Sequence, residues 1–139
     1  YTEGAKKNSA KSNHAAVVKY IAAEDQKCAM SANTVFGYPA YYDSSTPDST
    51  ATGTSGAFNC QTRTGSSIVA AAVDALDDFK NPYSPSSAAV RDSTKHAAKA
   101  DMGFVNVNDS DDTITVVTCY QNDCAATTDD VSNVIEVAE

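Results

Sequence analysis

The chain has 139 residues, of which 42% are hydrophobic, and its net charge at neutral pH is −8. This length fits a single domain, which we expect to span residues 1–139, and the acidic balance argues against a general affinity for nucleic acid. The charge is uneven: residues 1–27 hold five lysines and three acidic residues, a net charge of +2, so the remainder carries −10. The sequence shows neither a signal peptide nor a transmembrane run.

The first 30 residues are predicted to form one long amphipathic helix. Residues 2–30 contain no proline, and apolar or weakly polar side chains recur at helical spacing. These are His14, Val17 and Ile21, with Ala15, Val18 and Ala22 beside them. The helix would be about 42 Å long, whereas a chain of this size has a diameter of about 30–35 Å. Because the turns before Val17 are rich in lysine and serine, we expect the first half to project from its own domain or to contact another molecule.

Residues 31–102 are expected to form a long connection between this helix and a sheet, with a second helix near 66–80. The segment 43–56 is rich in serine and threonine and is predicted to be an exposed loop. Ser66 or Ser67 can cap the second helix, and Asn81-Pro82 would stop it. Residues 81–101 are expected to be irregular, with at most a helical turn at 86–91.

From residue 103 the apolar residues alternate with period two, which is typical of strands. Expected turns at 108–112 and 121–130 divide this region and predict an antiparallel sheet of three to four strands over 103–139. One face of such a sheet must be covered, and the two helices carry the only long apolar stripes. The sequence therefore predicts an α+β fold, in which the long N-terminal helix packs on a small antiparallel sheet.

Four cysteines, an even number in a small chain, are typical of disulfides formed in an oxidising compartment. A zinc site fits their spacing poorly, since no two of them form a CxxC pair. Of the three possible pairings, we favour Cys28–Cys60, which ties the end of the helix to the long loop, with Cys119–Cys124 as a short clip.

The sequence offers little that resembles a catalytic site. Neither His14 nor His96 lies near a candidate nucleophile in the sequence, and no phosphate-binding or hydrolase motif is present. We therefore expect a protein that is not an enzyme and needs no cofactor. The one metal candidate is weak: the acidic turn with Asp109, Asp111 and Asp112 has the hard oxygen ligands that calcium prefers, but it lacks the glycine and the distal glutamate of an EF-hand loop.

The order of these elements resembles that of a type IV pilin. The opening YTEGAKKNSA (residues 1–10) is similar to the stretch that follows the hydrophobic pilin segment, and SNHAAVV (12–18) resembles the part of that helix that reaches the sheet. The family's apolar run with a glutamate near its start is absent, so we expect that a segment before Tyr1 has been removed. Many pilins also enclose a longer C-terminal region between their two cysteines than Cys119 and Cys124 do here.

The resemblance implies a structural subunit of a type IV pilus on the cell surface, supporting adhesion, motility or DNA uptake. The missing apolar helix would hold the subunit in the inner membrane before assembly, and would then pack against other copies of the chain in the filament. Its partners would be those copies and the pilus assembly machinery, with no specific nucleic acid. The subunit interface would include Tyr1, Lys6, Lys7 and Lys11 at the basic front of the helix.

Two other functions remain open. The first is a pseudopilin of a type II secretion system, which would stay in the periplasm. The second is a free secreted binding module that uses the tyrosine-rich loop or the acidic turn. The sequence encoded before Tyr1 separates these possibilities, because a free module would have an ordinary cleaved signal peptide.

Overall fold

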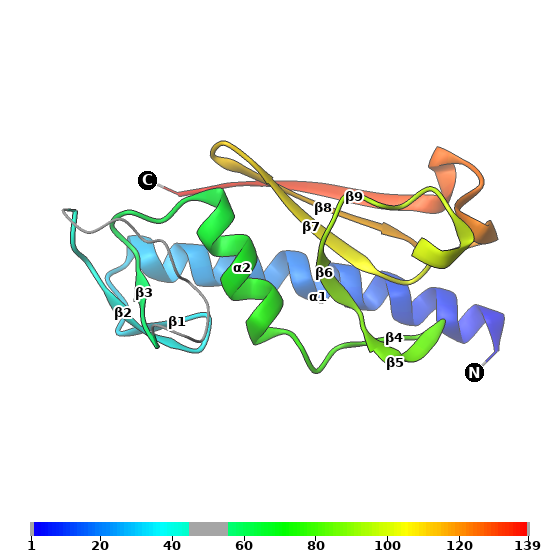
Figure 1. Cartoon of the computed structure of the whole chain (residues 1–139), viewed down its shortest axis with the longest axis horizontal. Helices are drawn as coiled ribbons and strands as arrows, with labels where there is room; N and C mark the ends of the chain where they lie inside the picture. Colours follow the sequence, from blue (N-terminus) through cyan, green and yellow to red (C-terminus); the bar gives the residue numbers. More distant parts are fainter. Residues whose placement is uncertain (1, 45–55, 139) are drawn as a thin grey trace.

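The computed structural model describes residues 2–44 and 56–138, and its longest element is helix α1, Glu3–Ala29. This helix runs along the long axis of an elongated molecule, from the N-terminus at one end to the small strands at the other (Figure 1). Thr2 caps it by accepting a hydrogen bond from the Ala5 amide at 3.1 Å, and Glu3 lies favourably in the first turn. The predicted N-terminal helix is therefore confirmed.

A four-stranded sheet lies against α1. Its strands are β6 (Val90–Asp92), β7 (Val105–Ser110), β8 (Thr113–Cys119) and β9 (Asp130–Glu136), in the order β6-β7-β8-β9. The last three are antiparallel, as expected, but β6 pairs with β7 in parallel, so the sheet is mixed. A parallel neighbour needs a crossover, which residues 93–104 provide.

Residues 31–102 were expected to form a loop with one helix. Besides that helix and β6, the described part of this region contains five short strands. Strands β1 (Thr34–Val35), β2 (Tyr38–Tyr41) and β3 (Phe58–Asn59) form one small sheet, and β4 (Lys80–Asn81) pairs with β5 (Ser84–Ala88). The predictions of an irregular segment at 81–101 and of a helical turn at 86–91 were therefore wrong. Most of the predicted exposed loop, 43–56, lies outside the described residues.

Helix α2, Gly65–Ala75, is shorter than the predicted 66–80. Its cap is Thr64, which exchanges hydrogen bonds with Ser67 in a capping box. The helix ends at Ala75, with Leu76 as its C-cap, and Lys80 and Asn81 of the predicted helical end and stop pair with β5. Three 3₁₀ turns complete the part of the chain that the structure describes: η1 (Lys99–Asp101), η2 (Asn122–Cys124) and η3 (Thr127–Asp129).

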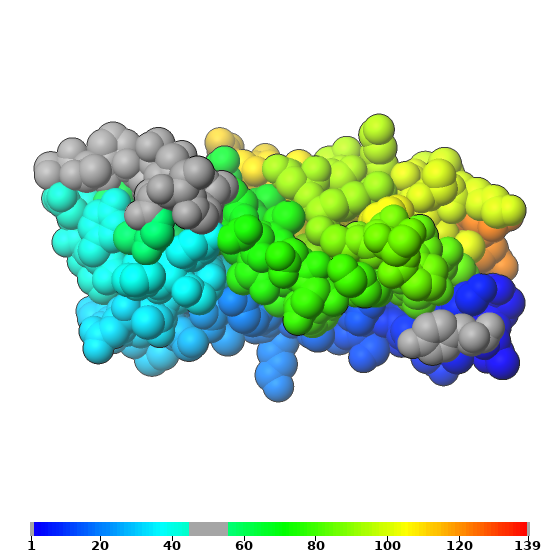
Figure 2. Space-filling view, turned by 60° about the horizontal axis from the view of Figure 1, so that its bottom comes forward, coloured from blue at the N-terminus to red at the C-terminus, as the bar shows by residue number. Residues whose placement is uncertain are grey.

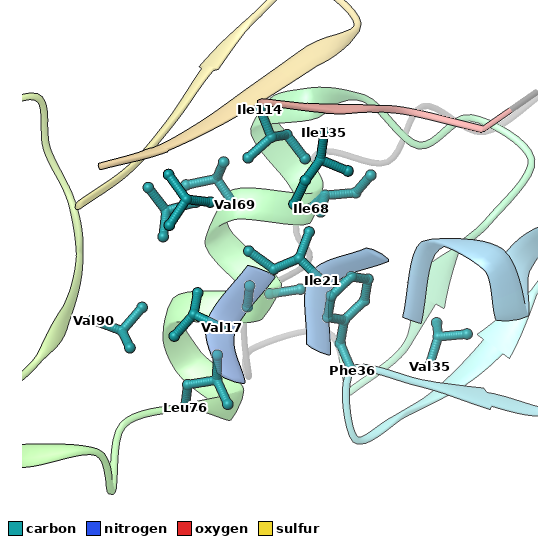
Figure 3. Packing of buried hydrophobic residues seen from close by; sticks show 14 of the residues in the cluster. Val17, Ile21, Val35, Phe36, Ile68, Val69, Leu76, Val90, Ile114 and Ile135 are labelled. Carbon is teal, nitrogen blue, oxygen red and sulfur yellow. The ribbon is translucent and has the colours of Figure 1, made fainter. Parts of the chain in front are cut away.

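The core lies between the two helices and one face of the sheet. Helix α1 contacts β8 and β9, while α2 contacts β6 and β7. Figure 3 shows Val17 and Ile21 of α1 meeting Ile68 of α2 near Ile114 and Ile135 of the sheet. Since apolar area removed from water is the main favourable term in folding, this contact fixes the position of α1.

The buried face of α1 continues into its first half, contrary to the sequence prediction. Ala10 has no exposed surface, and His14 is 3% exposed. Ala10 is thus buried in a part of the helix that has no larger apolar residue. The first half therefore does not project from the domain, although the opposite face of α1 is open to solvent along its length (Figure 2).

Gly65 marks the place where α2 meets the β7–β8 hairpin. A Cβ at this position would lie 2.8 Å from the Asp111 carbonyl oxygen and 3.0 Å from the Asp109 Cβ. Gly65→Ala should therefore destabilise the protein by about 1–3 kcal/mol, because backbone must move to accept the methyl group. Gly4→Ala is the matched control in α1: nothing lies within 4 Å, and we expect a neutral or slightly stabilising effect in urea denaturation. Equal effects of the two changes would contradict the close approach.

Candidate functional site

The lysines at the front of α1 lie over tyrosine rings of their own domain. Lys11 Nζ is 4.4 Å from the centre of the Tyr120 ring, and Lys7 Nζ lies 5.8 Å from the same ring. Lys6 Nζ is 5.7 Å from the Tyr83 ring. Cation–π contacts of this kind contribute about 0.5–1 kcal/mol each at exposed sites. They supply part of the attachment that apolar side chains do not provide in this half of the helix.

The predicted subunit interface is therefore partly used inside the monomer. Lys6 also forms an ion pair with Glu3 at 3.5 Å. Tyr1 lies outside the described residues. It stays a prediction that Lys6, Lys7 and Lys11 contact another subunit. Such a contact would have to form while these lysines remain over the rings of Tyr83 and Tyr120.

Both expected disulfides are present, in the favoured pairing: Cys28–Cys60 and Cys119–Cys124. The first joins the last turn of α1 to the residue after β3, and both of its cysteines are buried. The second closes a tight loop at the end of β8. Within this loop Asn122, Asp123 and Cys124 all have positive φ angles, a conformation that costs residues other than glycine free energy. The disulfide helps to hold the loop in this conformation.

The acidic turn is a tight hairpin and not a cluster of ligands. Ser110 pairs with Thr113, so that only Asp111 and Asp112 form the turn, and Asp109 belongs to β7. Over the described residues, no group of three or more histidine, cysteine or acidic side chains is placed to hold a metal ion. The weak calcium candidate formed by Asp109, Asp111 and Asp112 gains no support from this arrangement.

A buried ion pair, which was not predicted from the sequence, joins the end of α1 to the C-terminal segment. Arg63 Nε donates to Asp25 Oδ1 at 2.7 Å, and the two side chains are 9% and 3% exposed. The Arg63 guanidinium also donates to the carbonyls of Cys60 and Ala138. The Ala138 amide donates to Asp25 Oδ2 at 2.6 Å. Because Asp25 and Arg63 are 38 residues apart, no local pattern marks them as partners.

His14 connects α1 to the sheet. Its Nδ1 is 2.9 Å from Thr118 Oγ1 on β8, and its Nε2 is 2.7 Å from Asn133 Oδ1 on β9. The Asn133 oxygen can only accept, so Nε2 carries the proton and Nδ1 accepts from the threonine hydroxyl. Burial lowers the pKa of His14 below 6.5, and the hydrogen bond to Asn133 opposes this shift. These contacts are typical of a structural histidine.

The His14 contacts predict a specific pH dependence of stability. Since the folded-state pKa is lowered, the unfolded chain takes up a proton more readily, so His14 reduces the free energy of unfolding as pH falls below about 6.5. This loss levels off below the folded-state pKa. Between pH 7.5 and 5, urea denaturation should show that the free energy of unfolding falls less in His14→Gln than in the wild type. His96→Gln removes the other histidine as a control; an unchanged slope in His14→Gln would contradict the prediction.

A groove of about 590 Å³ opens beside His14, between α1 and the edge strand β9. Ala15, Val18 and Val131 give it an apolar floor, and Lys11 and Lys19 line it from the helix. Asp130 lines the groove at the β9 side, and its Oδ2 lies 2.8 Å from His96 Nδ1. His14 itself is held by a threonine and an asparagine.

A second side-chain contact, partly buried, involves a tyrosine of the small sheet. The Tyr38 hydroxyl donates to Asp74 Oδ2 at the end of α2. Burial, followed by the hydrogen bond to Asp74 and its negative charge, raises the pKa of Tyr38 to about 12. Tyr38 therefore stays neutral at physiological pH, and it ties β2 to α2.

No helix in the described part of the chain is both long and apolar enough to cross a membrane. Comparison of the chain with known protein families, with curated proteins and with solved structures finds no match.

Proposed function

We propose that the chain is the globular part of a structural subunit of a type IV pilus filament, exposed on the filament surface and supporting adhesion, motility or DNA uptake. The supporting observation is the direction of α1. Its first turn lies at one extreme of the elongated molecule, and Thr2, Glu3 and Gly4 are exposed there (Figure 1). A continuation of the helix toward the N-terminus would leave the body without meeting it.

The feature of α1 that supports a filament subunit is not the one that the sequence indicated. The sequence pointed to a first helical half with too little apolar surface for its own domain, and Ala10, His14 and the lysine–tyrosine contacts remove that reason. What remains is an accessible helix start that an apolar helical segment can extend. We propose that such a segment precedes Tyr1, holds the precursor in the inner membrane, and packs against other copies in the filament after assembly.

The proposal is tested on cells that carry the gene. Filaments sheared from the surface should contain this chain joined to an apolar segment on its N-terminal side, as mass spectrometry of tryptic peptides would show. Deletion of the gene should remove the filaments in electron micrographs, and antibodies against the purified domain should label them along their length.

Two results would point elsewhere. If the protein is found as a monomer in the medium and is encoded behind an ordinary cleaved signal peptide, it is a free secreted module and not a pilus subunit. A protein confined to the periplasm, whose deletion blocks protein secretion but leaves surface filaments intact, would indicate a pseudopilin.

A further inference from the structure

Strand β9 is one edge of the four-stranded sheet, and its outer backbone groups are unpaired. The Val137 amide bonds to the Asp112 carbonyl, and the Tyr120 amide to the Asp129 carbonyl. In an antiparallel ladder, hydrogen-bonded pairs alternate with unbonded ones, so the odd-numbered residues of β9 face β8. The amides and carbonyls of Asp130, Ser132, Val134 and Glu136 therefore point away from the sheet, and no strand of the described residues pairs with them.

The middle of this edge is not protected against pairing. Natural sheets block free edges with charges, proline or a bulge, but here the charges stand only at the two ends, at Asp130 and Glu136. Between them, Val134 leaves 63% of its surface exposed. Val134 is β-branched, and its backbone amide and carbonyl point away from the sheet. This position therefore favours pairing with another strand.

Helix α1 runs beside β9 in the same direction. His14 bonds to Asn133 at 2.7 Å, and Asp25 bonds to the Ala138 amide at 2.6 Å. The eleven helical steps between His14 and Asp25 cover about 16 Å, and the five strand steps between Asn133 and Ala138 cover nearly the same length, about 16 Å. The groove lies along the first part of this alignment, between residues 11–19 of the helix and 130–133 at the edge strand.

Two lysines line the groove from the helix, and Asp130, which is paired with His96 at 2.8 Å, lines it from β9, so the helix side of the groove suits an extended acidic segment. Lys11 and Lys19, both exposed, line the groove eight residues apart, which is about 12 Å along a helix. Residues i and i+4 of a strand point to the same side and lie about 13 Å apart. Acidic side chains with this spacing would face the two lysines, and an apolar residue at i+2 would lie over Ala15, Val18 and Val131.

We propose that the outer edge of β9 and its groove form a docking site for an extended segment of a different protein chain, with the pattern acidic-x-apolar-x-acidic. The segment adds to the sheet as a fifth strand through the outward backbone groups of Ser132 and Val134. Its acidic side chains pair with Lys11 and Lys19, and its central side chain fills the groove. Backbone pairing supplies affinity, and the alternate side chains supply specificity.

A second copy of this chain fits the edge less well. Antiparallel pairing of two β9 strands in the register that uses the whole strand sets Asp130 of one copy opposite Glu136 of the other. Like charges directly opposite each other are destabilising. A β9–β9 pair would also bring no acidic side chain to the α1 side of the sheet, because residues 131, 133 and 135 are uncharged.

The probe is the capped peptide Thr-Glu-Thr-Val-Thr-Glu-Thr, titrated to millimolar concentration into the ¹⁵N-labelled domain. We expect amide shifts to concentrate in β9 and in α1 between Lys11 and Lys19. Methylating the amides of the two central threonines, which would face β9, should weaken binding about tenfold or more. Methylating instead the amides of the valine and the second glutamate, which face away, is the matched control and should have little effect.

Two protein variants test the same contacts from the other side. Lys19→Gln should weaken binding about threefold to fivefold, as loss of one surface ion pair predicts. Val134→Pro removes an outward amide that β8 does not use, so it should preserve the fold and abolish binding. The proposal is overturned if no shifts occur, if both methylated peptides bind alike, or if the domain instead dimerises through β9 in sedimentation.

Discussion

Arg63→Ala is expected to lower the free energy of unfolding by about 3–5 kcal/mol. The substitution leaves the Asp25 carboxylate buried, with the Ala138 amide as its remaining partner in the ion-pair cluster. It also leaves the carbonyls of Cys60 and Ala138 without their guanidinium donor. Breaking a buried pair costs more than the pair itself contributes, because the remaining charge has lost its compensation. Urea denaturation followed by far-ultraviolet circular dichroism measures the change.

Two comparisons identify the cause of this loss. Glu3→Gln removes one member of the exposed pair with Lys6 and should cost less than about 1 kcal/mol. In the double variant Arg63→Met, Asp25→Leu, no charge is left unpaired, so much of the lost stability should return. The buried-charge explanation would be contradicted if the double variant were less stable than Arg63→Ala, so that the Asp25 substitution simply added its own loss of stability.

Removing the Cys28–Cys60 disulfide, by changing both cysteines to alanine, should destabilise the protein by about 4 kcal/mol. The bond closes a loop of 32 residues, and without it the unfolded chain gains the conformational freedom that closure had removed. It also holds Cys60 to the last turn of α1, and the Cys60 carbonyl accepts a hydrogen bond from Arg63. Differential scanning calorimetry of the oxidised wild type and of the variant measures the effect.

The second disulfide is the matched control. Cys119–Cys124 spans only five residues, so its removal should cost about 2 kcal/mol by the same chain-entropy relation. Reducing both disulfides of the wild type should destabilise the protein by nearly the sum of the two effects. If the two pairs of alanine substitutions had equal effects, the dependence on loop length would fail for this protein.

The sequence by itself determined the features that depend on local pattern. The proline-free stretch with residues at helical spacing gave α1 within two residues of its true ends. Alternation of apolar residues located β7, β8 and β9, and the positions of the cysteines favoured the pairing that the structure has. These predictions succeed because the periods of a helix and of a strand are fixed by backbone geometry.

Tertiary structure alone decided what the first half of α1 does. Ala10 is buried and Lys11 lies over the Tyr120 ring, and both depend on parts of the chain that are distant in sequence. Likewise, β6 looks irregular in sequence because a three-residue edge strand is too short for its alternation to be recognised.

The buried pair of Asp25 and Arg63, the bridge from His14 to the sheet, and the groove beside β9 were also beyond the sequence. Each joins residues far apart in the chain, and a sequence pattern records only neighbours along it. What brings them together is the burial of one face of α1 against the sheet, which sets the position of every side chain on both surfaces.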